Sequence, residues 1–282
     1  MREIACPICG AKSNPCFSAG EHRMHRCRAC RCAFLSPPPS DEVLGRFYEK
    51  FHGAWDGWYD EGEVRTALDF GVKVRRVREE VGSGARVLDV GCGKGLFVEE
   101  CVRAGLQAEG IDLSGEAVRA GVGRGVRLYQ RTVEEFKEGE GRYDAVTFWA
   151  TVEHLPRPLS TLSAMFALLK PGGRLFLDTG IGDDWLDRLL PGVTQWYDPP
   201  QHLFVFSEDG MRRLLSDAGF IDIRIDRCFE RTQLRKVVRI VRGAVVASAL
   251  RLVSDLGRLR TGRFEFRRYP LGNLMSVRAR RP

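Results

Sequence analysis

The chain has 282 residues, of which 44% are hydrophobic and 29% are charged, and its formal net charge is +7. This is the composition of a soluble globular protein, and the length allows one full-sized α/β domain with a small appendage. The longest apolar run, Ala244–Leu250, is too short to cross a bilayer, and residues 1–6 lack the apolar segment of a secretory signal. We therefore expect a cytoplasmic protein in which the nine cysteines are metal ligands or core thiols rather than disulfides. The basic charge permits binding to nucleic acid, anionic lipid or a phosphorylated substrate and does not choose among them.

The first 36 residues contain two cysteine pairs with the spacing of a zinc ribbon. Two residues separate Cys6 from Cys9 and Cys27 from Cys30, and 17 residues lie between the pairs. Four thiolates complete a tetrahedral Zn²⁺ site and leave no position for water, so we expect a structural zinc ion. Four further donors in this segment are expected to lie outside the metal site: Cys16, His22, His25 and Cys32.

A proline-rich linker follows the cysteine module. Residues 36–41 read Ser-Pro-Pro-Pro-Ser-Asp, which a helix cannot contain. We place the module at residues 1–36 and assign residues 37–81 to the linker and a helical cap in two pieces. The glycine- and aromatic-rich stretch 51–59 divides these pieces. Its rings either pack between segments or form a lid that excludes water from a pocket.

Strands and helices alternate from residue 85 onward, which predicts an α/β fold with a doubly wound, Rossmann-like, mostly parallel sheet of seven strands. The expected strands are 86–90, 108–112, 126–130, 144–149, 174–178, 220–227 and 273–280. The expected helices are 97–104, one capped by Ser114, one that begins at Pro158, and one that is capped by Ser207 and reaches Gly219. We assign residues 82–230 to this core and residues 266–282 to its final strand.

A basic helical insertion, residues 231–265, is expected before the final strand. Within residues 233–259, valines, leucines and Ala249 recur at helical spacing while arginines and a lysine occupy other positions. Such a helix either lies on an anionic membrane surface, or covers the core or a dimer interface with its arginines extended into solvent.

The most informative stretch is Arg86–Phe97, in which a buried strand runs into a glycine loop that begins a helix. Glycines allow the backbone N–H groups and the helix N-terminus to approach a bound ligand closely. Asp89 and Asp112 stand near the ends of the first two strands. The spacing Gly-x-Gly-x-Gly differs from a dinucleotide fingerprint. Asp89 would also repel a pyrophosphate, whereas it suits a ligand with an ammonium group.

These residues resemble the first two motifs of class I S-adenosylmethionine (SAM)-dependent methyltransferases. Residues 143–146, 152–155 and 168–175 agree with later parts of that pattern, so the resemblance spans 85 to about 229. It implies that the loop surrounds the methionine and ribose portions of SAM, that Asp89 lies near the amino group, and that Asp112 binds the ribose hydroxyls. The implied loop residues are Gly91, Cys92, Gly93 and Gly95. The implied adenine-pocket residues are Leu113, Thr132, Val133 and Glu134, although members of this family carry an acid nearer to position 132.

Two histidines are candidates for the general base that methyl transfer often requires. His154 follows the fourth strand, at the carboxyl edge where ligands bind in this fold, and Glu153 is placed to orient it. The methyltransferases that this chain resembles, including ubiquinone-pathway O-methyltransferases, carry a Glu-His pair at this point. His202 lies in the loop before the helix capped by Ser207 and is the second candidate. An imidazole acts as a base near neutral pH; the alternative is that each histidine only stabilises its loop.

The acceptor is expected to be a small molecule, a sugar or a lipid-linked metabolite, methylated at oxygen. The Asp-Pro-Pro sequence at 198–200 stands in the wrong place for an amino-group nucleic-acid methyltransferase, and no Pro-Cys or Thr-Cys nucleophile follows the fourth strand. A carbon activated by a neighbouring carbonyl group is also compatible. Two alternatives remain: an RNA methyltransferase that grips RNA with its ribbon, and a non-catalytic zinc scaffold with a vestigial cofactor pocket. Association into an oligomer is open.

Overall fold

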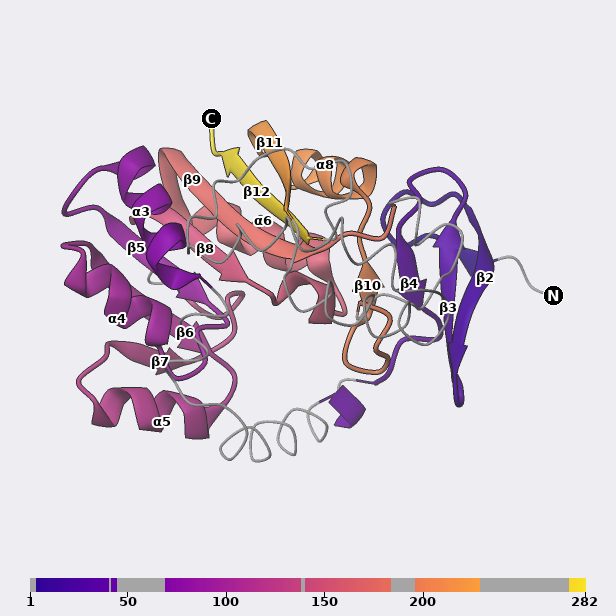
Figure 1. Cartoon of the computed structure of the whole chain (residues 1–282), viewed down its shortest axis with the longest axis horizontal. Coiled ribbons are helices and arrows are strands. Elements are labelled where there is room, and N and C mark those ends of the chain that lie inside the picture. Colours follow the sequence, from indigo (N-terminus) through magenta and orange to yellow (C-terminus); the bar gives the residue numbers. More distant parts are fainter. Residues whose placement is uncertain (1–3, 41, 45–68, 138–139, 184–195, 229–273) are drawn as a thin grey trace, which may run out of the picture.

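The computed structural model describes residues 4–40, 42–44, 69–137, 140–183, 196–228 and 274–282 (Figure 1). These residues form two β-sheets. The larger has seven strands in the order β11-β12-β9-β8-β5-β6-β7, and the smaller has five in the order β1-β2-β3-β4-β10. Figure 1 shows the smaller sheet at one end of the molecule, beyond the strands and helices of the larger one. The predicted α/β fold with an N-terminal cysteine module is therefore confirmed.

The large sheet has the predicted Rossmann-like order, with parallel strands followed by an antiparallel edge. Its strands are β5 (Arg86–Val90), β6 (Gln107–Asp112), β7 (Leu128–Gln130), β8 (Tyr143–Trp149), β9 (Leu169–Gly180), β11 (Ile221–Cys228) and β12 (Leu274–Arg280). The pairs β5–β6, β5–β8, β6–β7 and β8–β9 are parallel, whereas β12 is antiparallel to both β9 and β11. The fifth strand begins earlier than predicted because Leu169 already pairs with Tyr143, and an irregularity before Arg174 accommodates the Pro-Gly-Gly turn.

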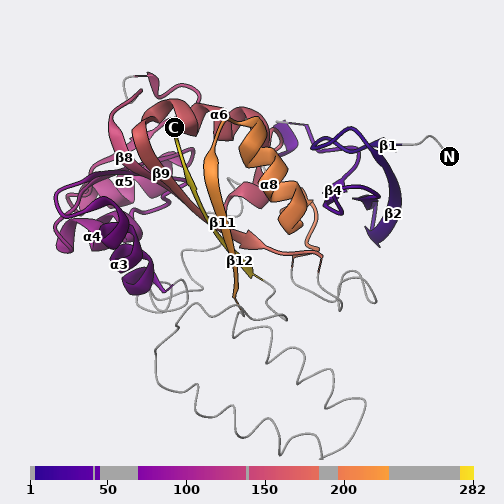
Figure 2. The same cartoon turned by 90° about the horizontal axis from the view of Figure 1, so that it is seen from above.

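Helices cover both faces of this sheet (Figure 2). On one face lie α3 (Phe70–Val81), α4 (Leu96–Arg103) and α5 (Gly115–Gly123); on the other lie α6 (Pro158–Leu168) and α8 (Glu208–Asp217). Side chains alternate along β5, so that Val87 joins the core beneath α3 and α4 while Leu88 joins the core on the opposite face. The predicted caps are present: the Oγ atoms of Ser114 and Ser207 accept hydrogen bonds from the backbone N–H groups of Ala117 and Gly210.

The small sheet combines four strands of the cysteine module with one strand from a distant part of the chain. Strands β1 (Ile4–Ala5), β2 (Lys12–Ala19), β3 (His22–Cys27) and β4 (Ala33–Leu35) form an antiparallel ribbon, and β10 (Phe204–Val205) extends it by pairing with β4. The hydrophobic core of the ribbon is also continuous with that of the α6 and α8 face, and it includes Met24, Phe34 and Phe206. The ribbon is thus joined to the rest of the chain by packing and by backbone pairing with β10.

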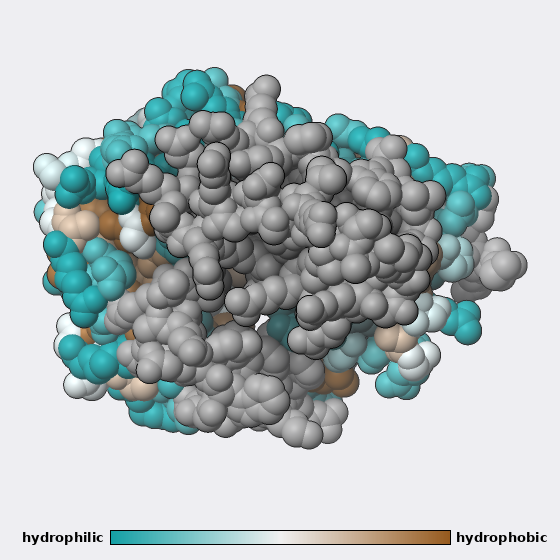
Figure 3. Space-filling model, in the orientation of Figure 1, coloured by the Kyte–Doolittle hydropathy of each residue, from teal (hydrophilic) through white to brown (hydrophobic). Residues whose placement is uncertain are grey.

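Two predicted features lie outside the described residues. These are the aromatic stretch 51–59 and the helical insertion 231–265, which includes the segment 233–259 for which membrane contact is one of the alternatives. In the part of the chain that the structure describes, no helix has the length and apolar character needed to cross a membrane. The described surface visible in Figure 3 is mostly hydrophilic at the edges of that view, with small hydrophobic patches between.

Candidate functional site

The glycine loop follows β5 directly and leads into α4, as predicted. Gly91, Gly93 and Gly95 have φ angles of 68°, 53° and 76°, a backbone region that favours glycine. A Cβ atom on Gly91 would lie 2.9 Å from Cγ2 of Thr151. Cys92 is buried, and burial, reinforced by Asp89 and Asp112, raises the pKa of its thiol. No side chain at position 91 therefore fits beside Thr151, and Cys92 is a buried thiol that keeps its proton.

Asp112 is positioned at the end of β6 to organise this loop. One carboxylate oxygen, Oδ2, accepts a hydrogen bond from the backbone N–H of Gly93, and Oδ1 accepts one from Ser114, both at 2.8 Å. The next residue, Leu113, is 67% exposed. This places a carboxylate and an uncovered leucine side by side at the mouth of the loop, where a nucleoside can meet both.

Asp89 lies deeper, at the carboxyl edge of β5, and is 4% exposed. Its Oδ1 accepts a hydrogen bond of 2.6 Å from the Thr147 hydroxyl. Burial raises the pKa of Asp89 to about 7, against the opposing effects of the Thr147 hydrogen bond and the positive charge of Lys73. A carboxylate in this state is stabilised as an anion by a bound cation.

Lys73 and Asp178 form a buried ion pair that the sequence analysis missed. Lys73 Nζ lies 2.6 Å from Asp178 Oδ2 and 4.5 Å from the centroid of the Trp149 ring. Oδ1 of Asp178 accepts a hydrogen bond from the Ala150 backbone N–H at 2.8 Å. A signal was available, because Lys73 falls on the apolar face of α3 beside Phe70 and Asp178 lies near the end of its strand, as Asp89 and Asp112 do.

The three residues predicted after β7 have separate environments. Thr132 and Glu135 cap each other: the Thr132 N–H donates to the Glu135 carboxylate and the Glu135 N–H donates to the Thr132 hydroxyl, both at 3.1 Å. Val133 is buried in the core. Glu134 Oε1 accepts a hydrogen bond of 2.7 Å from the Thr161 hydroxyl on α6. The hydrogen bond of Glu134 therefore joins the turn after β7 to α6.

The structure brings Glu153, His154 and His202 together beyond the end of β8, although the hydrogen-bonded His154 and Gln201 are 47 positions apart in the sequence. The imidazole rings of His154 and His202 have centroids 4.9 Å apart. His154 Nδ1 lies 2.8 Å from the Gln201 carbonyl oxygen, and His202 Nδ1 lies 3.1 Å from that of Trp196. Because a carbonyl oxygen only accepts, each Nδ1 carries a proton, so in the uncharged form of either ring the lone pair is on Nε2.

Burial controls the ionisation of this group. Glu153 is 2% exposed, and burial raises its pKa while the nearby His154 opposes that change. Burial, assisted by the charge of His154, lowers the pKa of His202 to about 4. Thr179 donates a hydrogen bond of 2.9 Å to Glu153 Oε2. At neutral pH the ring of His202 is therefore uncharged.

Two groups of side chains in the described residues are close enough to hold a metal ion. The sulfur atoms of Cys6, Cys9, Cys27 and Cys30 lie within 4.8 Å of one another, and so do one ligand atom each from Glu153, His154 and His202. Backbone groups support the first site, since the N–H of Ile8 donates to Cys6 Sγ. Cys16 and Cys32 stand outside it, as expected. Four converging thiols in a closed ribbon fit Zn²⁺.

The glycine loop, Asp89 and Asp112 thus lie together at the carboxyl edge of a doubly wound sheet, which is where ligands bind in folds of this kind. The chain belongs to the methyltransferase domain family, whose family model matches residues 66–224.

Comparison with known proteins agrees with this assignment. A ubiquinone biosynthesis O-methyltransferase of Bordetella bronchiseptica is 36% identical over 188 residues, which cover 59% of this chain and 78% of the relative. The corresponding protein of Xanthomonas axonopodis pv. citri is 41% identical over 173 residues, or 53% and 71% of the two chains. A SAM-dependent methyltransferase from Archaeoglobus fulgidus superimposes with a TM-score of 0.55 at 19% identity, over 83% of this chain and 100% of the other. The protein is therefore a SAM-dependent methyltransferase.

Proposed function

We propose that this enzyme transfers the methyl group of SAM to a hydroxyl oxygen of a small-molecule acceptor. The observation that carries the proposal is the Glu153–His154–His202 group, which stands at the same carboxyl edge of the sheet as the glycine loop. The relatives named as ubiquinone biosynthesis O-methyltransferases support an oxygen acceptor. A sugar or lipid-linked hydroxyl presents the same chemistry to the site.

In this proposal His154 is the general base. Its Nδ1–H is held by the Gln201 carbonyl group, so Nε2 is oriented to take the hydroxyl proton of the acceptor. The buried carboxyl group of Glu153 adjoins the ring and, when ionised, stabilises the imidazolium that forms. His202, with a pKa of about 4, is too weakly basic to compete with His154 for the proton and stays uncharged, with its Nδ1–H on the Trp196 carbonyl group. SAM supplies a methyl group on a cationic sulfur, which keeps the electron pair of the broken bond.

The indole groups beside this site offer further hydrogen-bond donors. Trp196 stacks on His202 with centroids 5.8 Å apart, and Trp149 lies above Lys73. Among the described residues, neither buried indole N–H meets an acceptor atom. Because unsatisfied buried donors are costly, we assign both to ligand binding: Trp149 on the cofactor side and Trp196 on the acceptor side.

The cofactor contacts are proposed from the resemblance to class I methyltransferases, and the loop geometry is compatible with them. Gly91, Cys92, Gly93 and Gly95 enclose the methionine and ribose portions, Asp89 binds the ammonium group, and Asp112 binds the ribose hydroxyls. The adenine ring is placed against Leu113, an exposed side chain that a ligand can cover. Thr132, Val133 and Glu134 form the edge of the adenine pocket. The four cysteines of the ribbon, Cys6, Cys9, Cys27 and Cys30, are proposed to hold one structural Zn²⁺.

Replacement of Asp112 by alanine is expected to weaken cofactor binding by about 1–3 kcal/mol, because hydrogen bonds to the ribose are lost. Calorimetric titration with S-adenosylhomocysteine (SAH) measures this directly. Glu116→Ala is the matched control, since it removes an exposed carboxylate four residues away on α5. Equal affinities in the two variants would refute the role of Asp112.

SAH affinity is also expected to depend on pH through Asp89. In the free protein the pKa of Asp89 is about 7, and an ammonium ligand binds best to the ionised carboxylate. Affinity should therefore fall as the pH drops below about 7, by up to about tenfold per unit, and level off above about pH 8. The same raised pKa means that the folded state holds this proton more tightly than the unfolded state, so the contribution of Asp89 to stability declines as the pH rises from about 4 to 7. Asp89→Asn should abolish the pH dependence of binding; persistence of the slope would assign it elsewhere.

The proposed function is tested by methyl transfer from SAM with a labelled methyl group. Zinc-loaded protein is first titrated with SAH, and phenols, catechols, sugars and lipid-linked hydroxyl compounds are then screened as acceptors. Transfer to oxygen supports the proposal. Transfer to nitrogen, carbon or RNA, or the absence of SAH binding by folded protein, contradicts it.

A further inference from the structure

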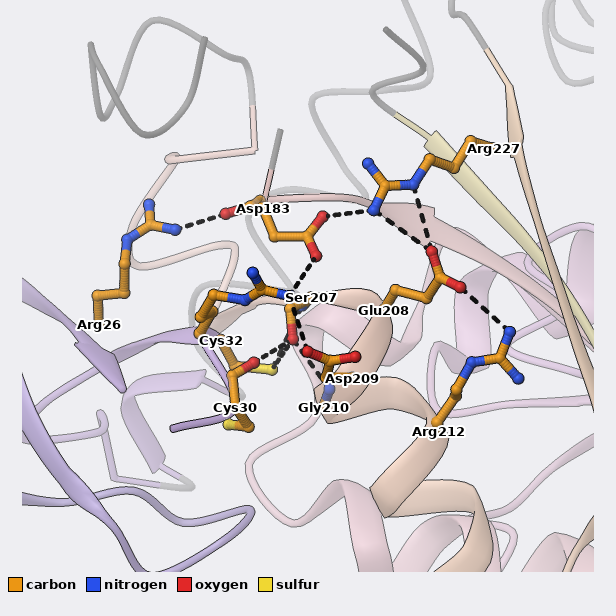
Figure 4. Close-up of polar contacts among 12 residues, drawn as sticks. Arg26, Cys30, Cys32, Asp183, Ser207, Glu208, Asp209, Gly210, Arg212 and Arg227 are labelled. Atoms are coloured by element: carbon orange, nitrogen blue, oxygen red, sulfur yellow. Dashed lines mark hydrogen bonds and ion pairs between the residues drawn. The ribbon is translucent and has the colours of Figure 1, made fainter. Parts of the chain in front are cut away.

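Ser207 joins the cysteine ribbon to the start of α8 (Figure 4). Its side chain is fully buried, and its hydroxyl donates a hydrogen bond to the carbonyl group of Cys30 while accepting one of 2.9 Å from the Gly210 N–H. The backbone N–H of Ser207 donates to Cys32 Sγ at 3.3 Å. One residue thus caps a helix of the methyltransferase core and binds the second cysteine pair of the ribbon.

The ribbon also holds the segment that carries His202. We call residues 196–206 the histidine loop. At its end, the Leu35 N–H of β4 donates to the Leu203 carbonyl group at 2.8 Å, and β10 pairs with β4. The Leu203 N–H donates to the carbonyl group of Glu153, also at 2.8 Å. Leu203 is therefore fixed on one side by the ribbon and on the other by the residue next to His154.

The beginning of the histidine loop is held by the ribbon as well. The Arg26 guanidinium donates hydrogen bonds to the Tyr197 hydroxyl and to the carbonyl group of Gly182, just beyond β9. Phe17 of β2 meets the Tyr197 ring edge-on, with centroids 5.3 Å apart. Both ends of the loop therefore depend on contacts with the ribbon.

Charged groups reinforce the same junction. Arg31, one residue after Cys30, lies 2.7 Å from Asp209 on α8 and 3.7 Å from the buried Asp183. Asp183 is itself held by Arg227 at 3.0 Å (Figure 4). The turn of the second cysteine pair is thus tied to α8 and to the end of β9.

We propose that the cysteine ribbon is a positioning element for catalysis, which acts through Ser207, Arg31 and the β4–β10 pairing to hold His202 against His154. The inference deepens the proposed function and rests on it for the catalytic role of the histidines. The claim that the ribbon holds the histidine loop can be tested without knowing the acceptor, because the position of the loop is measurable without methyl transfer.

Gly210→Ala separates the ribbon from α8 without removing a hydrogen-bonding group. The new Cβ would lie 2.0 Å from Cys32 Sγ and 3.1 Å from Ser207 Oγ, so the ribbon must shift. Alanine otherwise favours the helix relative to glycine. Gly71→Ala in α3 is the matched control, because a Cβ there meets nothing within 4 Å.

The first readout is amide hydrogen exchange of the full-length protein, compared with SAH affinity. Gly210→Ala is expected to raise exchange in peptides from 196–206 about tenfold or more, with no change in peptides from 86–97 or in SAH affinity. The double variant Gly210→Ala/Cys32→Ala removes the clashing sulfur and should restore protection. Unchanged loop exchange, an equal rise in both regions, or no rescue would overturn the proposal.

Arg31→Ala carries the test if Gly210→Ala does not fold, with Arg28→Ala as control. Arg28 bonds to Asn14 within the ribbon, so only the Arg31 variant should expose the loop. With an acceptor from the screen, either junction variant should lower kcat and leave the KM for SAM unchanged. If His154→Ala keeps normal turnover while the exchange result holds, the base assignment fails and the loop contacts stand. If His154→Ala loses turnover but the junction variants leave exchange in the histidine loop unchanged, only the positioning role of the ribbon is overturned.

Discussion

Replacing His154 with alanine is expected to lower the rate of methyl transfer roughly 10²–10⁴-fold while leaving SAH affinity unchanged. The effect is large because His154 is the proposed acceptor of the proton that leaves the attacking hydroxyl. Binding should survive, since the glycine loop and Asp112 are organised by β5, β6 and α4 rather than by η2 (Val152–His154). Single-turnover rates with labelled SAM and calorimetry with SAH measure the two quantities independently.

Two companion variants sharpen this result. His202→Ala should cost less than His154→Ala, because a ring with a pKa of about 4 is a weak base near neutral pH. His22→Ala, on β3 of the ribbon, is the control and should retain full turnover. Normal turnover in His154→Ala would move the base to His202, or leave the reaction to positioning alone.

The glycine loop was predictable because its signals are local in sequence. The predicted first strand, 86–90, is identical to β5, and the predicted caps at Ser114 and Ser207 are present. A buried strand, the three glycines of the loop and two strand-end acids lie within 27 residues, from 86 to 112. Each of these features follows from backbone conformation or strand periodicity, which neighbouring residues determine.

The contacts that complete the site were not predictable in the same way. β10 is two residues long and pairs with a strand more than 160 residues earlier, and no periodicity reveals such a partner. For Lys73, unlike β10, the sequence does contain a partial signal. Its place on the apolar face of α3 was visible, but a lysine there is equally compatible with an extended surface side chain. Only the fold shows that Asp178 lies opposite and makes a buried pair.

The ribbon itself shows how a strong local motif leaves its role open. The cysteine spacing predicts a closed metal site, and the four sulfur atoms do converge. The spacing contains no information on what the ribbon contacts. Its hydrophobic core merges with that of the α6 and α8 face, so loss of the ribbon should destabilise the histidine loop before it destabilises the glycine loop.

Cys27→Ser is expected to abolish stoichiometric zinc binding and unfold the ribbon, whereas Cys16→Ser should still bind zinc and keep a folded ribbon. Cys27 Sγ lies 3.3 Å from Cys9 Sγ within the four-thiol group, while Cys16 lies outside it and donates to the Met24 carbonyl group. Structural zinc in small thiolate sites contributes about 10–16 kcal/mol of apparent binding free energy, which is comparable to the total stability of a typical domain. Metal content by elemental analysis, and amide exchange across 4–35, report the two effects.

The same variant distinguishes a structural metal from a dispensable one. If zinc maintains the ribbon and the ribbon holds the histidine loop, Cys27→Ser should raise exchange in 196–206 and lower kcat, with SAH affinity little changed. Chelation of the wild-type protein should reproduce that pattern, and added zinc should reverse it in the wild type but not in the variant. A Cys27→Ser protein that keeps a protected ribbon without metal would show that packing against α8 suffices. The four thiols would then be a consequence of the fold, and the junction at Ser207 alone would position the histidines.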